Sequence, residues 1–95
     1  MVKKSLLLFY CKKVLYQSED KKFTSGIWQA TPFSTKAISF PYHEFILVKK
    51  GSLVCIDNHD IEHEVSENQA LFIPKGLTCT WCTESSIIIY FVQIK

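Results

Sequence analysis

The sequence contains no apolar run long enough to cross a membrane and no extended segment with helical periodicity. A membrane-spanning helix needs about 18 apolar residues, and every apolar run in this chain is far shorter. Glycine and proline are scarce, at three residues each, which argues against a disordered or low-complexity chain. A chain of 95 residues that is 47% hydrophobic and 14% aromatic is expected to form one globular domain over residues 1–95.

Strong charge of either sign is also missing. The net charge is +2, the lysines are spread along the chain, and there is no arginine-rich run or basic stripe. Proteins that bind nucleic acids usually carry a clustered basic footprint. We therefore expect neither a nucleic-acid partner nor a membrane partner.

The N-terminus superficially resembles the start of a signal peptide, with Lys3 and Lys4 before the apolar run Leu6–Tyr10. This run has about five residues, whereas the apolar region of a signal peptide has about 7 to 15. We interpret it as a first β-strand and expect the protein to be cytoplasmic. Four cysteines without a secretory signal are then expected to be free thiols rather than a disulfide framework. They are Cys11, Cys55, Cys79 and Cys82.

Short apolar or alternating runs recur along the chain, and turn residues separate them about every 8 to 12 residues, which is typical of a β-sandwich or barrel. The expected strands are Leu6–Tyr10 and Val14–Gln17 (one strand or two), Phe23–Thr31, Lys36–Phe40, Phe45–Val48, Leu53–Ile56, Ile61–Val65, Ala70–Ile73, Thr78–Cys82 and Ile87–Ile94. A small all-β domain protects its edges by closing into a barrel or a double-sheet jelly roll. The predicted fold class is therefore all-β.

Three local features refine this prediction. Gly26 lies inside an expected strand, which indicates a β-bulge or a close approach of another chain segment. The continuous apolar run Phe45–Val48 favours a strand covered on both faces. The segment Asp57–Asp60 has the composition of a hairpin turn. Ile87–Val92, the most hydrophobic stretch, is expected either deep between two sheets or in a dimer interface.

Three motifs in order resemble those of the cupin superfamily. They are G-I-W-Q-A-T-P at 26–32, P-Y-H-E-F at 41–45 followed by Gly51, and A-L-F-I-P-K-G at 70–76 followed by Trp81. The chain is most similar to small single-domain cupins related to the ethanolamine-utilisation and ureidoglycine aminohydrolase groups. The resemblance covers about residues 24–92, with residues 1–22 as N-terminal strands. It implies a jelly-roll barrel, a homodimer, and a ligand or metal pocket inside the barrel.

The metal ligands that the resemblance implies are mostly missing. Similar metal-binding cupins place two histidines where this chain has Ala37 and Ser39, and a third where it has Cys79; only the glutamate is kept, as Glu44. A divalent metal needs three or four protein donors, so no metal cofactor is expected. If a metal did bind, Glu44 and Cys79 would be its ligands. The family's Gly-Asp is replaced by Asn68-Gln69, and Asn68 can still adopt the positive φ of a glycine.

Glu44 is the main candidate for function. Side chains alternate along a strand, so Tyr42, Glu44, Ile46 and Val48 are expected on one face. A carboxylate pointing into a barrel must be paired, hydrogen-bonded or neutralised by a raised pKa. Glu44 could therefore be a catalytic or ligand-binding group, or a structural carboxylate satisfied by tyrosine hydroxyls or backbone.

Other reactive side chains give weaker signals. Cys79 and Cys82 form a C-x-x-C pair, but on one strand they point to opposite faces with Cα atoms about 10 Å apart, which is too far for a disulfide. We expect Cys79 and Trp81 on the inner face and Cys82 outside. His43 is expected opposite Glu44, His59 in a turn, and His63 on either face.

The expected ligand pocket combines the residues around Glu44 with those of the first and last motifs. It comprises Tyr42, Glu44, Ala37, Ser39, Cys79, Trp81, Trp28 and Gln29. Phe72 could join Trp28, Trp81 and Tyr42 in an aromatic pocket, although each of these rings could equally be core packing.

Three hypotheses follow for the function. The leading one is a cupin with a degenerate metal site that binds a small polar ligand or acts as a non-catalytic module. The second is an enzyme, either metal-dependent through Glu44, Cys79 and a histidine, or metal-free with Glu44 as general base. The third is a structural homodimer without a ligand. An open cavity beside Glu44 would favour the first hypothesis, and a filled interior the third.

Overall fold

The computed structural model describes residues 10–95 and contains ten β-strands within this range. They are β1 (Tyr10–Gln17), β2 (Phe23–Ala30), β3 (Phe33–Ser34), β4 (Ile38–Ser39), β5 (His43–Lys50), β6 (Leu53–Asp57), β7 (Glu62–Val65), β8 (Ala70–Ile73), β9 (Thr78–Thr83) and β10 (Ile87–Ile94). The strand expected over Leu6–Tyr10 lies outside the described residues except for Tyr10. Residues 10–95 contain no helix of the length and hydrophobicity that crossing a bilayer requires.

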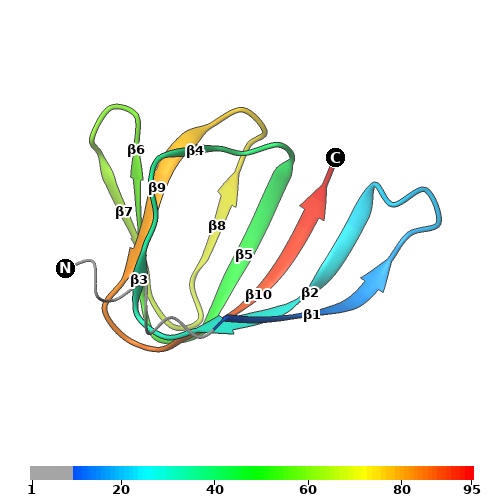
Figure 1. Ribbon diagram of the computed structural model, residues 1–95, viewed down its shortest axis with the longest axis horizontal. Helices are drawn as coiled ribbons and strands as arrows, with labels where there is room; N and C mark the ends of the chain where they lie inside the picture. Colours follow the sequence, from blue (N-terminus) through cyan, green and yellow to red (C-terminus); the bar gives the residue numbers. More distant parts are fainter. Residues whose placement is uncertain (1–9) are drawn as a thin grey trace.

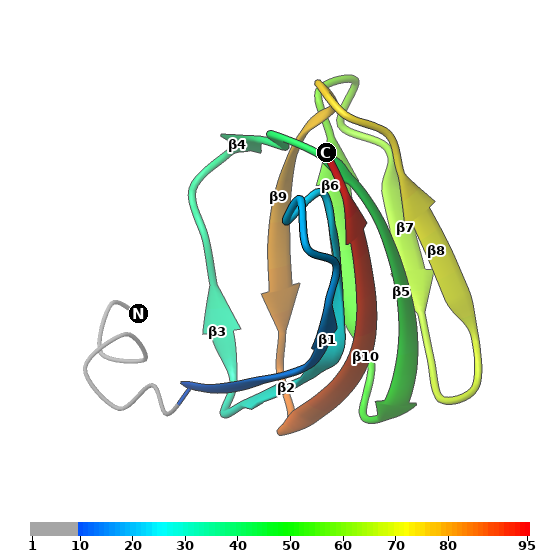
Figure 2. The same cartoon turned by 90° about the vertical axis from the view of Figure 1, so that its right-hand side faces the viewer.

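The strands form two antiparallel sheets. Each sheet has five strands. The sheet with the longer strands, which we call the larger sheet, has the order β1-β2-β10-β5-β8. The smaller sheet has the order β3-β9-β6-β7, with β4 also paired to β9. Figure 1 shows the larger sheet curving round to face the smaller one. Figure 2 shows β3 and β4 beside β9 and away from β10 and β5. The all-β prediction is therefore confirmed.

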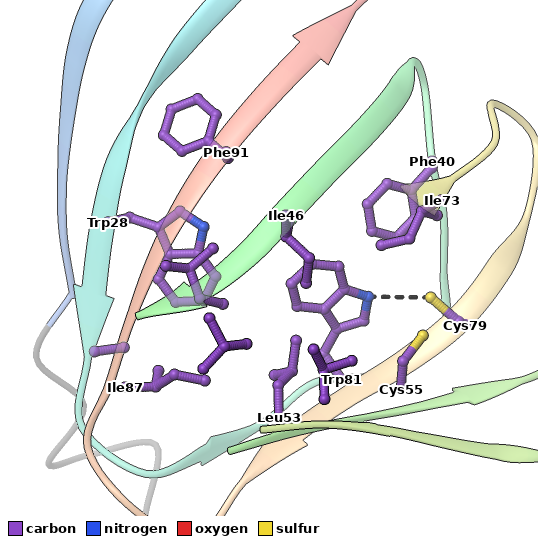
Figure 3. Close-up of a cluster of buried hydrophobic side chains, with 14 residues drawn as sticks. Trp28, Phe40, Ile46, Leu53, Cys55, Ile73, Cys79, Trp81, Ile87 and Phe91 are labelled. Carbon is purple, nitrogen blue, oxygen red and sulfur yellow. Dashed lines mark hydrogen bonds between the residues drawn. The ribbon is translucent and has the colours of Figure 1, made fainter. Parts of the chain in front are cut away.

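The core fills the space between the sheets because side chains alternate along each strand. In β5, Glu44, Ile46 and Val48 are buried while their neighbours are exposed or half-buried, as predicted. In β10, Ile87, Ile89 and Phe91 point inward. The buried hydrophobic cluster comprises Trp28, Ala30, Phe40, Ile46, Val48, Leu53, Cys55, Val65, Ile73, Cys79, Trp81, Ile87, Ile89 and Phe91 (Figure 3).

Gly26 lies where β1 and β2 approach each other closely. A Cβ atom at this position would lie 2.2 Å from the backbone oxygen of Lys13 and 3.0 Å from the ring of Phe91. The pairing of β1 with β2 also shifts register between Val14 and Tyr16, next to the Val14–Gly26 pair. Both the bulge and the close approach indicated by the sequence are present.

The turns also follow the sequence signals. The Asp57 carboxylate accepts hydrogen bonds from the backbone N–H groups of His59 (2.9 Å) and Ile61 (3.0 Å), and Asp60 has a φ of 63°. Asn68 has a φ of 66°, which confirms that it takes the conformation that glycine would otherwise supply. The first turn fixes the register of β6 with β7. At the second turn, backbone hydrogen bonds join Val48 of β5 to Asn68 and Gln69, just before β8, which pairs with β5.

The expectation that Phe45–Val48 is covered on both faces was wrong. Phe45 is 43% exposed, and only Ile46 and Val48 of this run are fully buried. The run is continuously apolar because its outward residues join an apolar patch on the outer face of the larger sheet. The strand expected over Lys36–Phe40 is shorter, Ile38–Ser39, and β3 directly follows Pro32 without having been predicted.

Candidate functional site

A cavity of about 320 Å³ opens between the two sheets. Its walls come from β1, β2 and β5 on one side and from β9 and the β3–β4 segment on the other. Residues separated widely in the sequence therefore meet in it. The lining residues are Tyr10, Trp28, Phe33, Thr35, Ile38, Phe40, Glu44 and Trp81.

Glu44 is the one carboxylate among the described lining residues. It sits near the start of β5, where strand alternation turns it inward beside Ile46, and only 5% of its surface is exposed. Within residues 10–95, its one side-chain hydrogen bond comes from Gln93 Nε2, which donates to Oε2 at 3.5 Å. This bond is at the long limit for N–H···O hydrogen bonds, so it compensates poorly for the loss of water.

Burial raises the pKa of Glu44 to about 7. The hydrogen bond from Gln93 and the positive charge of Lys12 act in the opposite direction but are weaker than the desolvation. Because water stabilises the ionised form best, a buried carboxyl group holds its proton more tightly. Glu44 therefore changes charge near neutral pH, as groups tuned for binding or proton transfer often do.

Three further polar side chains surround Glu44. Burial and then the charge of Glu44 raise the pKa values of both Tyr10 and Tyr42. Lys12 pairs with Trp28 across β1 and β2, and its Nζ lies 5.1 Å from the centre of the Phe91 ring. The Lys12 ammonium group is thus held on the inner face of the sheet by a cation–π contact.

Aromatic rings form most of the remaining wall. The centroids of Trp28 and Trp81, which reach in from facing sheets, are 6.3 Å apart (Figure 3). Trp81 stacks on Phe40 at 5.4 Å, and Trp28 lies 6.1 Å from Phe33 and 5.7 Å from Tyr10. The rings thus form a continuous chain of contacts that holds the shape of the cavity.

Trp81 and Thr35 are locked in place by hydrogen bonds. The Trp81 indole Nε1 donates to Cys79 Sγ at 3.0 Å (Figure 3), and the Trp81 backbone N–H donates to Thr35 Oγ1 at 3.0 Å. The Thr35 N–H in turn donates to the Trp81 carbonyl oxygen at 2.9 Å. These bonds fix the loop that carries Thr35 against β9.

Cys79 is buried behind the cavity wall rather than in it. Its neighbour Cys55 is equally buried, and burial, followed by the contact with Cys79, raises the pKa of the Cys55 thiol to about 12. Cys82 is half-buried on the opposite face of β9, and all four cysteines are free. The arrangement agrees with the interpretation that the C-x-x-C spacing does not form a disulfide.

The donors needed for a metal do not converge at this site. Among residues 10–95, no group of three or more histidine, cysteine, aspartate or glutamate side chains is arranged to hold a metal ion. Ile38 pairs with the inward-facing Cys79 on β9, so within residues 36–42 it is Ile38 and Phe40 that reach the cavity. Both carry hydrocarbon side chains, and the residues present therefore do not fit the metal that similar cupins hold.

The predicted pocket residues are divided by the fold. Trp28, Glu44 and Trp81 line the cavity. Tyr42 is half-buried and near enough to Glu44 for its pKa to respond, but it does not line the wall. Ala37 and Ser39 are exposed, because the inward positions fall one residue later than the counted spacing implied.

Two other expected pocket residues face outward. Gln29 is exposed on the outer face of β2. Phe72 is 56% exposed and stacks on His43 outside the sheet, with the ring centroids 6.0 Å apart. Neither side chain is among those lining the cavity.

The cavity also contains residues that the sequence interpretation missed, namely Tyr10, Phe33, Thr35, Ile38 and Phe40. The apolar positions 38 and 40 on either side of Ser39 were an available signal, since alternate residues share one face of a strand. No comparable signal marked Tyr10, whose position depends on the pairing of β1 with β2.

The three histidines do not line this cavity. His43 Nδ1 accepts a hydrogen bond from the Lys75 backbone N–H at 3.0 Å on the outer side of β5. His63 pairs with Asp57 at 2.9 Å, and this contact, with backbone hydrogen bonds, lowers the pKa of Asp57 to about 2. His59 lies in the hairpin turn.

A family model for the EutQ-like cupin domain matches residues 17–88 of the chain. No curated protein matches it. Solved structures do match, at low identity. The EutQ protein of Clostridium difficile is 20% identical with a TM-score of 0.78, and the alignment covers 90% of this chain and 67% of that one.

Two further structures extend the comparison. A putative ethanolamine utilization protein Q from Salmonella typhimurium LT2 is 20% identical with a TM-score of 0.79, over 90% of this chain and 68% of that one. A protein of unknown function from Pseudomonas syringae pv. tomato is 16% identical with a TM-score of 0.86, and this chain covers only 37% of it. The shared feature is the fold, a jelly roll of two antiparallel sheets, as the sequence resemblance implied.

Proposed function

The chain belongs to the EutQ-like cupin domain family, and from this premise we propose that it is a metal-independent cupin that binds a small molecule beside Glu44. The observation that carries the proposal is a carboxyl group, 5% exposed, that lines a cavity of about 320 Å³ and receives, within residues 10–95, one side-chain hydrogen bond of 3.5 Å. A cavity of this size is at the lower end of the range for small-molecule sites, about 300 to 1,000 Å³.

The long hydrogen bond from Gln93 replaces poorly the water that the Glu44 carboxyl group loses on burial, and this supports a binding role. A buried polar group without good partners lowers the stability of the fold by about 1–3 kcal/mol. Such an arrangement is unfavourable in an empty protein, but a ligand that donates a hydrogen bond or carries positive charge would reverse the penalty. The aromatic wall would supply the apolar contacts.

An enzymatic role is the second candidate, and the pKa of Glu44 near 7 favours it. A general base works best when its pKa lies near the working pH. Besides Glu44, the one titratable group in the described cavity wall is the phenol of Tyr10, whose pKa burial raises further above neutral pH. Binding without turnover needs no second acid or base, and it therefore explains the site more simply.

The test is a thermal-shift screen of the purified protein against small cationic, neutral and anionic metabolites, together with native mass spectrometry for co-purified ligands. We expect a class of compounds that raises the melting temperature of the wild type and of Glu62→Gln, but less so that of Glu44→Gln. Glu62 is an exposed carboxylate on β7 and serves as the matched control. If no compound stabilises the wild type and no small molecule co-purifies, the binding proposal fails.

Elemental analysis addresses the metal directly. We expect purified protein to contain substoichiometric Mn, Fe, Ni and Zn, before and after incubation with each ion. Stoichiometric metal that is lost in both Glu44→Gln and Cys79→Ser would overturn the metal-independent proposal and favour the enzyme.

The four free thiols support a reducing compartment such as the cytoplasm.

We also propose that the protein forms a homodimer through the outer face of its larger sheet. Outward side chains form two rows, each crossing three strands. The first row, on β2, β10 and β5, is Ile27–Tyr90–Leu47. The second row, on β10, β5 and β8, is Val92–Phe45–Phe72. We call these six residues the outer patch. Tyr90, Phe45 and Phe72 are 41%, 43% and 56% exposed. Contiguous apolar surface of this kind usually marks an interaction site, and a two-fold dimer would cover it with its own copy.

Light scattering during gel filtration tests the dimer. We expect twice the monomer mass for the wild type and the monomer mass for Phe45→Lys. The control is Leu15→Lys, because Leu15 is a 62% exposed apolar residue on β1 outside the outer patch. A monomeric wild type at micromolar concentration would contradict the dimer and leave the binding proposal unaffected.

A further inference from the structure

The cavity combines an aromatic wall with a single carboxylate. Five of the eight lining residues are aromatic, namely Tyr10, Trp28, Phe33, Phe40 and Trp81. Resting on the proposed binding function, we propose that the ligand of this site is a small organic cation, an alkylated ammonium whose charge is neutralised by Glu44 and whose alkyl groups contact the rings.

The aromatic rings favour a cation of this type. Aromatic rings attract cations through the negative potential of their faces, and cages of such rings bind quaternary and methylated ammonium groups. The interior of this sheet already contains one such contact, because Lys12 Nζ lies 5.1 Å from the Phe91 ring centre. Alkyl substituents on the ligand would also bury apolar surface against the same rings.

The charges around the cavity also favour a cationic ligand. Glu44 is the one charged side chain among the described residues that line it. The charge of Lys12 acts on Glu44 more weakly than either burial or Gln93 does, and Lys12 does not line the wall. An anionic ligand would therefore face a carboxylate without a basic group in the wall to balance it.

The scarcity of other polar atoms argues against sugars and other polyhydroxylated ligands. Among the described lining residues, the polar side chains besides Glu44 are the Tyr10 phenol, Thr35 and the two indoles. Thr35 Oγ1 already accepts from the Trp81 backbone, and the Trp81 indole already donates to Cys79. A polyhydroxylated ligand would leave most of its hydroxyl groups unpaired, and each unpaired buried group is unfavourable.

The test compares choline with 3,3-dimethyl-1-butanol, which has the same shape but carbon in place of the charged nitrogen. Binding to the 95-residue protein is measured at pH 8 by tryptophan fluorescence and by NMR shifts of the Trp28 and Trp81 indole N–H signals. We expect choline to bind the wild type and Glu62→Gln at least about tenfold more tightly than the neutral compound, the size of a desolvated cation–π and charge interaction. Glu44→Gln should lose this preference while keeping a cooperative thermal transition.

The possible outcomes distinguish a failure of the cation inference from a failure of the proposed small-molecule binding. Equal binding of both compounds to the wild type would overturn the cation inference and keep the small-molecule site. A choline preference that survives in Glu44→Gln would overturn the role of the carboxylate. If neither these compounds nor the metabolite panel binds at millimolar concentration, both the cation inference and the proposed function fail.

Discussion

At the residue scale, the central feature is a carboxyl group held in an environment that opposes its ionisation. Glu44 is turned inward by strand alternation, and the one side-chain hydrogen bond it receives from the described part of the chain, from Gln93, is long. Burial therefore decides its pKa, which is raised to about 7. Such a residue lowers the stability of the fold at neutral pH, which is a common property of functional groups.

The first prediction is that Glu44→Gln stabilises the protein in a pH-dependent way. Glu44 has a pKa of about 7 in the folded protein, above its ordinary value of 4.5, so the folded state holds the extra proton between these pH values. Stability should therefore fall as the pH rises from 4.5 to 7, by up to about 3 kcal/mol, and then stay level.

Urea unfolding at several pH values checks this prediction. We expect Glu44→Gln and the wild type to have similar free energies of unfolding at pH 4, and the variant to be more stable at pH 8. The Glu62→Gln control should follow the wild type at every pH. A variant less stable than the wild type at pH 8 would show that the carboxylate is well satisfied and structural.

The affinity for choline should also depend on the ionisation of Glu44. Because the cation binds the ionised carboxylate, we expect its affinity to rise as the pH increases through about 7 and to level off above it. Lys12, Tyr10 and Tyr42 are the other titratable groups near Glu44. Burial and the charge of Glu44 raise the pKa values of both phenols above their ordinary value, so neither phenol ionises over this range. A flat profile between pH 6 and 8 would disagree with an interaction through Glu44, and isothermal calorimetry would measure it.

The four thiols should differ strongly in reactivity. Only the thiolate is nucleophilic, and burial raises the pKa of Cys55 to about 12, whereas Cys11 is exposed on β1. With iodoacetamide at pH 8, mass spectrometry should find Cys11 modified first and Cys55 modified only after unfolding in urea. Modification of Cys55 at the same rate as Cys11 in the native protein would contradict the buried arrangement.

At the element scale, the position of β1 matters most for the site. β1 is an edge strand whose eight residues are all exposed, yet it contributes Tyr10 to the cavity and Lys12 to the surroundings of Glu44. Its attachment to β2 depends on the close approach at Gly26. The geometry of one wall of the cavity therefore depends on a residue that does not touch the cavity.

Gly26→Ala tests this dependence. The added Cβ would lie 2.2 Å from the Lys13 backbone oxygen, so β1 must move away from β2. We expect a loss of about 1–3 kcal/mol in the free energy of unfolding and a weaker response of the Trp28 signal to ligand. Ser25→Ala, at the adjacent half-buried position, should change both by much less. Equal effects of the two substitutions would disprove a specific role for the close approach.

At the scale of the whole molecule, the larger sheet uses both of its faces. Its inner face forms the core and the cavity, while its outer face carries the outer patch. β10 contributes to both, with Ile89 and Phe91 inside and Tyr90 and Val92 outside. The inner face of this strand therefore confirms the position between the two sheets, whereas the dimer interface on its outer face remains the proposal made above.

Thermal unfolding at different protein concentrations tests the proposed dimer. If the folded protein is a dimer, mass action makes its melting temperature rise with concentration. We expect such a rise for the wild type and for Leu15→Lys, and a constant, lower value for Phe45→Lys. A melting temperature of the wild type that is independent of concentration would indicate a monomer under these conditions.

The sequence by itself determined the all-β class, most strands, the turns at Asp57–Asp60 and Asn68, and the face that Glu44 shares with Ile46 and Val48. These features depend on local rules, namely the two-residue alternation of strands and the conformational preferences of turn residues. The alternation also placed Cys79 and Trp81 on one buried face. Only the tertiary structure decided which side chains surround Glu44. Ile38 and Phe40 reach the cavity because their segment pairs with residues near β9, which is distant in sequence. Tyr10 reaches it because the long hairpin of β1 and β2 lies beside β10 in the same sheet. Counting residues from Glu44 led to Ala37 and Ser39 instead of Ile38 and Phe40, since a shift of one residue reverses the face to which every side chain points.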